Sequence, residues 1–119
     1  MIKMLVLCYE KCSTCKSALK WLDQSGLEYE VRDIKGEHPK YEELKHWYQK
    51  SGLNIKRFFN TSGLSYKSLN LKDKLDGMDE DEKLKLLATD GMLVKRPLVV
   101  TKDCVLLGFK EAEWELHLL

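Results

Sequence analysis

A short apolar run followed closely by a pair of cysteines constrains the fold of this chain more than any other stretch. Residues 4–8 (Met-Leu-Val-Leu-Cys) are continuously apolar, which predicts a strand buried on both faces. From Cys15 the apolar residues recur at the spacing of one helical face, and Ser25-Gly26 ends that pattern. Residues 28–34 alternate as in a second strand. Strand, helix and strand in about thirty residues predict a right-handed βαβ unit, with Cys12 near the carboxyl end of its first strand.

The later patterns extend this unit into a single α/β domain. Helical patterns dominate residues 38–94, including a short helix at 66–71 and a helix that begins with a capping box of Asp79 and Glu82. Residues 98–101 and 104–107 predict an antiparallel hairpin, and residues 111–118 predict a final helix. We therefore predict a thioredoxin-like fold over residues 1–119, in the order βαβ…ββα, with a mixed four-stranded sheet and a helical insert at about 38–94.

Composition favours neither a nucleic-acid partner nor a membrane protein. Twenty Lys and Arg residues nearly cancel nineteen Asp and Glu residues, so overall charge does not indicate a nucleic-acid or membrane partner. No apolar run approaches the ~20 residues of a membrane span, and the N-terminus leaves no room for a signal peptide before the first strand. We expect a cytoplasmic protein. In that reducing compartment, Cys12 and Cys15 favour redox or metal chemistry over a structural disulfide.

Cys12 is the leading candidate for a nucleophile. It lies where the polar loop meets the predicted helix, and unpaired N–H groups and the helix dipole at that end favour a thiolate. Ser13 or Thr14 would then cap the helix and leave the thiol exposed. The alternative is a small buried cysteine without chemistry, but the polar neighbours Lys11, Ser13 and Thr14 argue against it.

The other cysteines are less tied to chemistry. Cys15 lies on the inward helical face, where it either resolves an adduct on Cys12 or packs in the core. Cys8 completes a Cys-x3-Cys-x2-Cys spacing known from iron–sulfur proteins, but it belongs to the apolar strand, and Cys104 is also predicted to be core. The three histidines are isolated, and no pair has zinc-ligand spacing, so we predict no metal site.

Arg96-Pro97 is the second candidate feature. A proline that enters a strand opposite the thiol loop is a candidate cis-proline, which would direct the Arg96 side chain toward Cys12. There the guanidinium would stabilise a thiolate or bind an oxyanion through two hydrogen bonds. The alternative is a proline at a strand edge with a solvated arginine. Lys16 and Lys95 are weaker candidates for nearby charges.

Taken together, these motifs resemble the arsenate reductase (ArsC)/Spx family over essentially the whole chain. The resemblance rests on Cys12-Ser-Thr-Cys15-Lys16, Phe59-Asn-Thr-Ser-Gly63, Asp90-Gly91, Lys95-Arg-Pro-Leu98 and Leu107-Gly-Phe109. It implies a thioredoxin-like fold with a helical lobe, a nucleophilic Cys12, and an oxyanion-binding Arg96 before a cis-proline. In the glutaredoxin-linked arsenate reductases three arginines hold the oxyanion. Only Arg96 clearly matches here, because Asn60 and Phe109 stand near the other two positions.

The resemblance implies a thiol-dependent oxidoreductase without a bound cofactor. Cys12 would attack an oxyanion or disulfide, and Cys15 or an external reductant (glutathione with glutaredoxin, or thioredoxin) would resolve the adduct. We place Cys12, Cys15 and Arg96 in the catalytic set, and Ser13, Thr14, Lys16, Asn60 and Pro97 around the substrate. A second hypothesis is an Spx-type regulator, in which Cys12 and Cys15 form a redox switch and RNA polymerase, through its α subunit, is the partner. A glutathione-binding protein without catalysis is a third.

Overall fold

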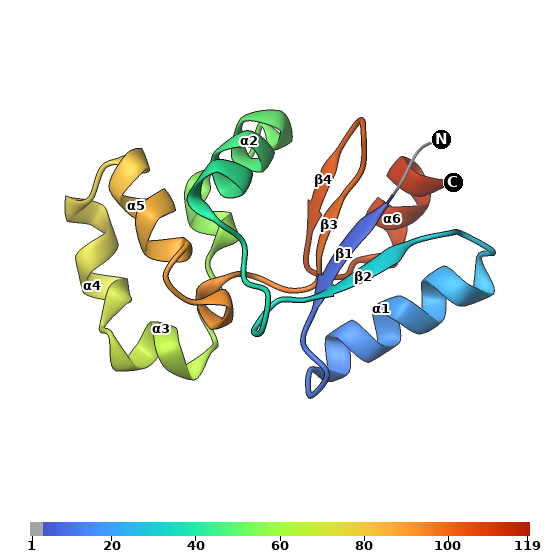
Figure 1. Ribbon diagram of the computed structural model, residues 1–119, viewed down its shortest axis with the longest axis horizontal. Helices are drawn as coiled ribbons and strands as arrows, with labels where there is room; N and C mark the ends of the chain where they lie inside the picture. Colours follow the sequence, from blue (N-terminus) through green and yellow to red (C-terminus); the bar gives the residue numbers. More distant parts are fainter. Residues whose placement is uncertain (1–3) are drawn as a thin grey trace.

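The computed structural model describes residues 4–119, which form a four-stranded sheet with helices on both faces (Figure 1). The strands are β1 (Leu5–Cys8), β2 (Glu30–Asp33), β3 (Leu98–Val100) and β4 (Val105–Leu107). The α-helices are α1 (Ser13–Gln24), α2 (Tyr41–Ser51), α3 (Leu64–Ser68), α4 (Leu71–Lys74), α5 (Glu80–Leu87) and α6 (Glu111–Leu118). Short 3-10 helices are η1 (Ile55–Phe58), η2 (Leu75–Gly77) and η3 (Gly91–Leu93).

The sheet has the order β2-β1-β3-β4 and is mixed, which confirms the predicted α/β fold class. β1 runs parallel to β2 and antiparallel to β3, and β3 runs antiparallel to β4. The carboxyl end of β1 therefore lies beside the start of β3, and Leu7 lies opposite Leu98. This topology places the loop after β1 beside the residues that precede β3, namely Arg96 and Pro97.

β1 is apolar throughout because both faces of the sheet are covered. Successive side chains of a strand point to opposite faces. Val6 and Cys8 belong to the core shared with α1 and α6, whereas Leu7 belongs to the core shared with the helices between β2 and β3. All three residues are buried, as the uninterrupted apolar run predicted.

Three aromatic rings hold α1 and α6 together beneath the sheet. Phe109 and Trp114 meet edge-to-face at a centroid distance of 4.8 Å, and Trp21 packs edge-to-face on Trp114 at 5.8 Å. The Trp114 indole also donates a hydrogen bond to the Gly108 carbonyl. Because each such ring pair contributes roughly 0.5–1.5 kcal/mol beyond its buried area, this cluster fixes the segment after β4 that borders the site described below.

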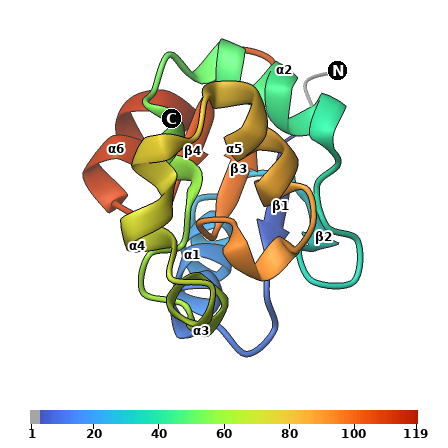
Figure 2. The ribbon, with the colours of Figure 1, turned by 90° about the vertical axis from the view of Figure 1, so that its left-hand side faces the viewer.

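The helices between β2 and β3 form a lobe on the opposite face (Figure 1). The predicted capping box of α5 is confirmed, since the Glu82 N–H donates to the Asp79 carboxylate. The single helix predicted at 66–71 is wrong. Asn70 has a φ of 55°, a left-handed conformation that separates α3 from α4, so that the two helices point in different directions (Figure 2).

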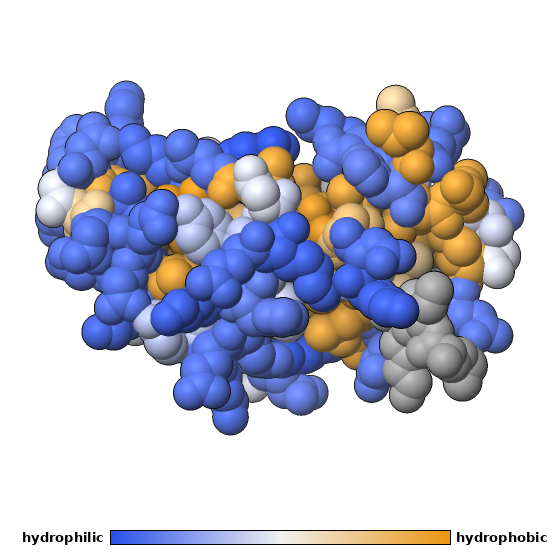
Figure 3. Space-filling model, turned by 90° about the horizontal axis from the view of Figure 1, so that it is seen from above, coloured by the Kyte–Doolittle hydropathy of each residue, from blue (hydrophilic) through white to orange (hydrophobic). Residues whose placement is uncertain are grey.

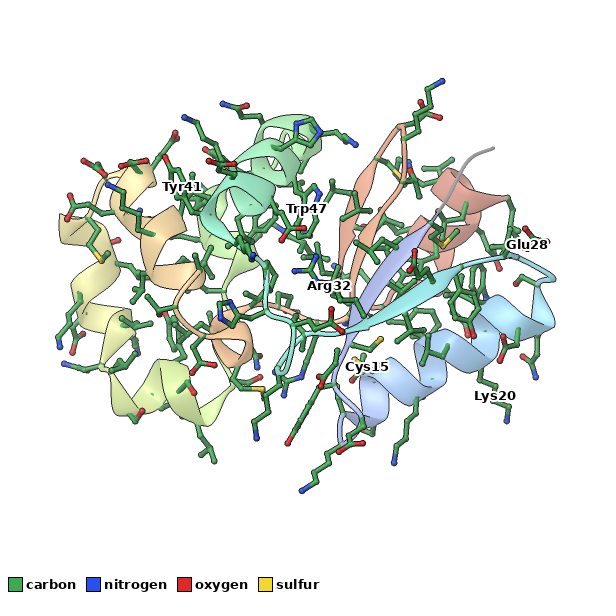
Figure 4. The ribbon with its side chains drawn as sticks, in the orientation of Figure 1. Cys15, Lys20, Glu28, Arg32, Tyr41 and Trp47 are labelled. Carbon is green, nitrogen blue, oxygen red and sulfur yellow. The ribbon has the colours of Figure 1, made fainter. Side chains whose placement is uncertain are left out.

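Arg32 ties the edge strand β2 to α2. Its guanidinium forms two hydrogen bonds to the Glu43 carboxylate, at 2.7 and 2.9 Å, and two more to the carbonyls of Glu37 and His38. Figure 4 shows Arg32 reaching from β2 toward α2. The same strand leaves Val31 49% exposed, because β2 is at the edge of the sheet.

The surface differs between the two ends of the molecule. Seen from above, the surface over the helical lobe is mainly hydrophilic, whereas hydrophobic residues reach the surface at the end that carries α6 (Figure 3). Leu116 in α6 and Leu119 after it are 77% and 68% exposed. Within residues 4–119, no helix has the length and apolar character needed to cross a membrane.

Candidate functional site

Cys12 is itself the N-cap residue of α1. The Cys12 N–H donates to the Tyr9 carbonyl at 3.0 Å, which closes the loop after β1, and the Cys12 carbonyl accepts from Lys16 at 3.1 Å. The expectation that Ser13 or Thr14 caps the helix is therefore wrong, because α1 begins at Ser13 and both residues lie within it. Among residues 4–119 no side chain caps the first turn, so its N–H groups remain available to a thiolate or a bound anion.

A cleft of about 540 Å³ opens beside the half-buried Cys12. It gathers residues from the start of α1, from segment 56–63 of the helical lobe, from the turn before β3 and from segment 107–110 after β4. Of the residues that the structure describes, no carboxylate lines it, and five cationic side chains do: Lys56, Arg57, Lys95, Arg96 and Lys110. Lys56 is paired with Asp76 outside the cleft. This excess of positive charge makes the cleft a favourable place for an anion.

Backbone pairing holds the two sides of this cleft together. The Lys95 N–H donates to the Phe58 carbonyl, and the Asn60 N–H donates to the Leu93 carbonyl, both at 2.7 Å. This short pairing, with a bridge between Phe59 and Val94, joins the helical lobe to the segment that leads into β3. It therefore brings Asn60 into the same cleft as Arg96.

Arg96 has hydrogen-bond donors that the described residues do not satisfy. The bond from Arg96 to Pro97 is cis, as predicted. The guanidinium carbon lies 5.2 Å from the centre of the Tyr9 ring, a cation–π distance. Within residues 4–119 its buried Nε and Nη1 atoms have no hydrogen-bond partner. Because leaving a buried donor unpaired costs about 1–3 kcal/mol, this side chain is suited to receive an acceptor from a ligand.

Asn60 is fixed by its own loop. It is 7% exposed, and its side-chain oxygen accepts a hydrogen bond from the Ser62 hydroxyl at 3.2 Å. Gly63 packs tightly against this side chain: a Cβ at position 63 would lie 2.7 Å from the Asn60 amide nitrogen. The close contact explains a glycine at this position and keeps the Asn60 loop against the cleft.

Cys15 lies outside the cleft. It is 1% exposed, and Figure 4 shows it in the first turn of α1, beneath the sheet. The neighbouring Cys8 thiol and burial raise the pKa of Cys15 above its ordinary value. Cys15 and Lys16 line a separate cavity of about 330 Å³ together with Cys8.

The structure thus divides the predicted site residues. Cys12, Thr14, Asn60 and Arg96 line one cleft, as does Lys95, whereas Ser13, Cys15, Lys16 and Pro97 are not among its lining residues. Sequence reasoning missed three of the five cations: Lys56, Arg57 and Lys110. The adjacent pair Lys56-Arg57, directly after the Asn54 cap, was the available signal for two of them. No cluster of His, Cys, Asp or Glu within residues 4–119 is arranged to hold a metal ion.

The chain belongs to the ArsC family, whose family model matches residues 7–116. It is 54% identical over 107 residues to the uncharacterized protein YusI of Bacillus subtilis strain 168, covering 90% of this chain and 91% of that protein. It is 29% identical to the regulatory protein MgsR of the same organism, covering 88% and 82%. Similarity extends to the global transcriptional regulator Spx of Staphylococcus saprophyticus, at 22% identity over 86% of this chain and 76% of that protein.

Solved structures agree with this assignment. An ArsC-family-related protein from Bacteroides fragilis superposes with a TM-score of 0.93 and 55% identity, covering 95% of each chain. A protein described as a possible arsenate reductase, from Streptococcus mutans UA159, superposes with a TM-score of 0.86 and 44% identity, covering 98% of this chain and 97% of that chain. The family and fold that the sequence motifs resembled are therefore confirmed.

Proposed function

We propose that this protein is a thiol-dependent reductase in which Cys12 is the nucleophile. The observation that carries the proposal is the position of Arg96 in the cleft of Cys12, with two buried donors that lack partners among the described residues. An oxyanion would supply acceptors for those donors, as would the carboxylate groups of an organic disulfide and the thiolate that its cleavage releases. The free N–H groups at the start of α1 would stabilise the Cys12 thiolate.

The proposed reaction proceeds by displacement at Cys12. With a disulfide substrate, the Cys12 thiolate attacks one sulfur, forms a mixed disulfide and expels the other sulfur as a thiolate. Cys15 or an external thiol then attacks the mixed disulfide and releases the second half of the substrate in reduced form. With an oxyanion such as arsenate, the Cys12 sulfur replaces one oxygen, which is protonated and leaves as water, and external thiols supply the two electrons. Glutathione with glutaredoxin, or thioredoxin, is the proposed reductant.

Cys12→Ser tests the assignment, and Cys104→Ser is its matched control. Cys104 is half-buried rather than fully in the core, with its sulfur 3.2 Å from the Thr101 hydroxyl, and it does not line the cleft. We expect Cys12→Ser to lose measurable reduction of both arsenate and glutathione disulfide, with thiol reductants supplied, and Cys104→Ser to keep it. Retained turnover in Cys12→Ser would refute the nucleophile.

The relatives MgsR and Spx, both named as regulators, favour a second candidate function. In an Spx-type protein the pair Cys12 and Cys15 senses oxidants, and RNA polymerase is the partner. A pull-down with the polymerase α subunit, comparing oxidised with reduced protein, separates the two functions. Redox-dependent capture without thiol turnover favours the regulator, and turnover without capture in either state favours the enzyme.

A further inference from the structure

Cys12, Cys15 and Cys8 extend from the cleft to the buried core. Cys12 is half-buried at the cleft, Cys15 is 1% exposed in the first turn of α1, and Cys8 is 5% exposed at the end of β1. Cys8 and Cys15 belong to the same buried cluster between the sheet and α1, and Cys12 packs against that cluster. All three are free thiols. The reductase reaction proposed above uses Cys12, with Cys15 or an external thiol as the resolving group, and gives Cys8 no role.

Cys8 and Cys15 are close enough to affect each other's ionisation. The Cys15 thiol lowers the pKa of Cys8, while Cys8 and burial raise the pKa of Cys15. Both side chains also line the cavity of about 330 Å³ that lies apart from the cleft of Cys12. Cys15 therefore shares one buried cluster with Cys12, which lines the cleft, and with Cys8, which lines the second cavity.

We propose that Cys8 is a third redox residue, which takes over the disulfide first formed between Cys12 and Cys15. This inference rests on the proposed function, and specifically on its route in which Cys15 resolves the adduct, because that route supplies the first disulfide. The product is a buried Cys8–Cys15 disulfide and a Cys12 thiol restored to the cleft.

The exchange needs no further oxidant. Cys8 attacks the Cys15 sulfur, a Cys8–Cys15 bond forms, and the Cys12–Cys15 bond breaks with its electron pair leaving on Cys12. The proton lost by Cys8 passes to Cys12, directly or through solvent, so one disulfide and one thiol stand on each side of the equation. The number of oxidised equivalents in the protein stays the same.

The local environment favours this direction of exchange. A better-stabilised thiolate leaves faster, and Cys12 leaves at the N-terminus of α1, into a cleft lined by five cations. The new disulfide joins two almost fully buried residues, which shields it from large external reductants. With Cys12 free again, the protein can react with a second equivalent of substrate.

Disulfide mapping with glutathione disulfide as the probe tests this proposal. Reduced protein is treated with excess probe, quenched in acid, digested and analysed by mass spectrometry. We expect the starting protein to end with a Cys8–Cys15 disulfide and one glutathionyl group on Cys12. We expect Cys8→Ala to end with a Cys12–Cys15 disulfide and no stable glutathionyl group, while Cys104→Ala behaves like the starting protein.

The outcomes separate the two proposals. A terminal Cys12–Cys15 disulfide in the starting protein, with Cys8 still open to alkylation after denaturation, overturns the exchange and leaves the proposed function standing. Failure of Cys12 to form any adduct overturns both. Because the mapping of the starting protein is decisive by itself, the result does not depend on how well Cys8→Ala folds, and Cys8→Ser gives an isosteric check on that variant.

Discussion

Two half-buried arginines in this protein have opposite surroundings. Arg32, at the edge of the sheet, donates two hydrogen bonds to Glu43 and two to backbone carbonyls. Arg96, before β3, rests on the Tyr9 ring and has two buried donor atoms without partners among residues 4–119. Both side chains carry the same guanidinium, so the difference lies in what the fold places around them.

This difference separates an arginine that holds the structure together from one that is prepared for a ligand. Arg32 has its partners in the folded chain and joins β2 to α2. The partners of Arg96 must come from outside the described chain, and it shares its cleft with Cys12. Substitution of the two residues should therefore give opposite results, with stability affected at one site and activity at the other.

Replacing Arg96 should have the largest effect. We expect Arg96→Ala to lower kcat/KM by about 10²–10³-fold, because it removes the donors that stabilise negative charge in the cleft. Its free energy of unfolding should stay the same or rise slightly, since two unsatisfied donors are removed. Arg96→Lys, which keeps the charge but lacks the planar fork, should recover only part of the activity. Steady-state kinetics alongside urea denaturation measures both effects, and Arg96→Ala kinetics within twofold of the starting protein would contradict the comparison.

Replacing Arg32 should reverse this pattern. We expect Arg32→Ala to lower the free energy of unfolding by about 1–2 kcal/mol, a value reduced for the partial exposure of the ion pair. Its kcat/KM should be unchanged, because Arg32 does not line the cleft. Glu43→Gln is the matched variant, since it removes the charge of the partner and keeps its shape. A loss of activity as large as that of Arg96→Ala, in folded protein, would show that the two arginines do not divide the roles.

Local patterns predicted most of the fold. The continuous apolar run of β1, the capping box at Asp79 and the final helix at 111–118 all depend on residues near one another in the sequence, and all three are confirmed. The break at Asn70 was missed, because its left-handed conformation interrupts a run that the pattern of apolar residues presents as one helix. The exposure of Val31 likewise depends on β2 being an edge strand, which an alternating pattern does not reveal.

The candidate site was predictable only where its residues flank the sheet. Cys12 and Arg96 adjoin strands whose topology brings them together, so their pairing could be inferred from strand order. Lys56 and Arg57 reach the cleft only because segment 58–60 pairs with segment 93–95. The unsatisfied donors of Arg96 depend on three-dimensional packing, which sequence spacing does not specify.

Replacing Tyr9 should have a smaller effect on activity, because the Tyr9 ring acts by supporting Arg96. The Tyr9 ring supports the guanidinium at 5.2 Å, and its carbonyl closes the Cys12 loop. We expect Tyr9→Leu to raise KM by about 3–10-fold with little change in kcat, the loss of roughly 1 kcal/mol of cation–π interaction. Tyr9→Phe keeps the ring and should keep KM. If Tyr9→Phe is as impaired as Tyr9→Leu, the hydroxyl rather than the ring face matters.

The smallest effect should appear in the pH dependence of stability. Arg32 holds the pKa of Glu43 below its ordinary value of 4.5. A carboxylate whose pKa is depressed by folding contributes stability above its unfolded pKa and loses it as pH falls through the folded value. The starting protein should therefore lose stability more steeply below about pH 4.5 than Glu43→Gln, which has no proton to take up at that position.

Urea midpoints between pH 7 and 3 measure this pH dependence of stability, and parallel curves would mean that the Arg32–Glu43 pair contributes no pH-dependent stability. The same scan on Arg96→Ala should run parallel to the starting protein, because Arg96 has no carboxylate partner among the described residues.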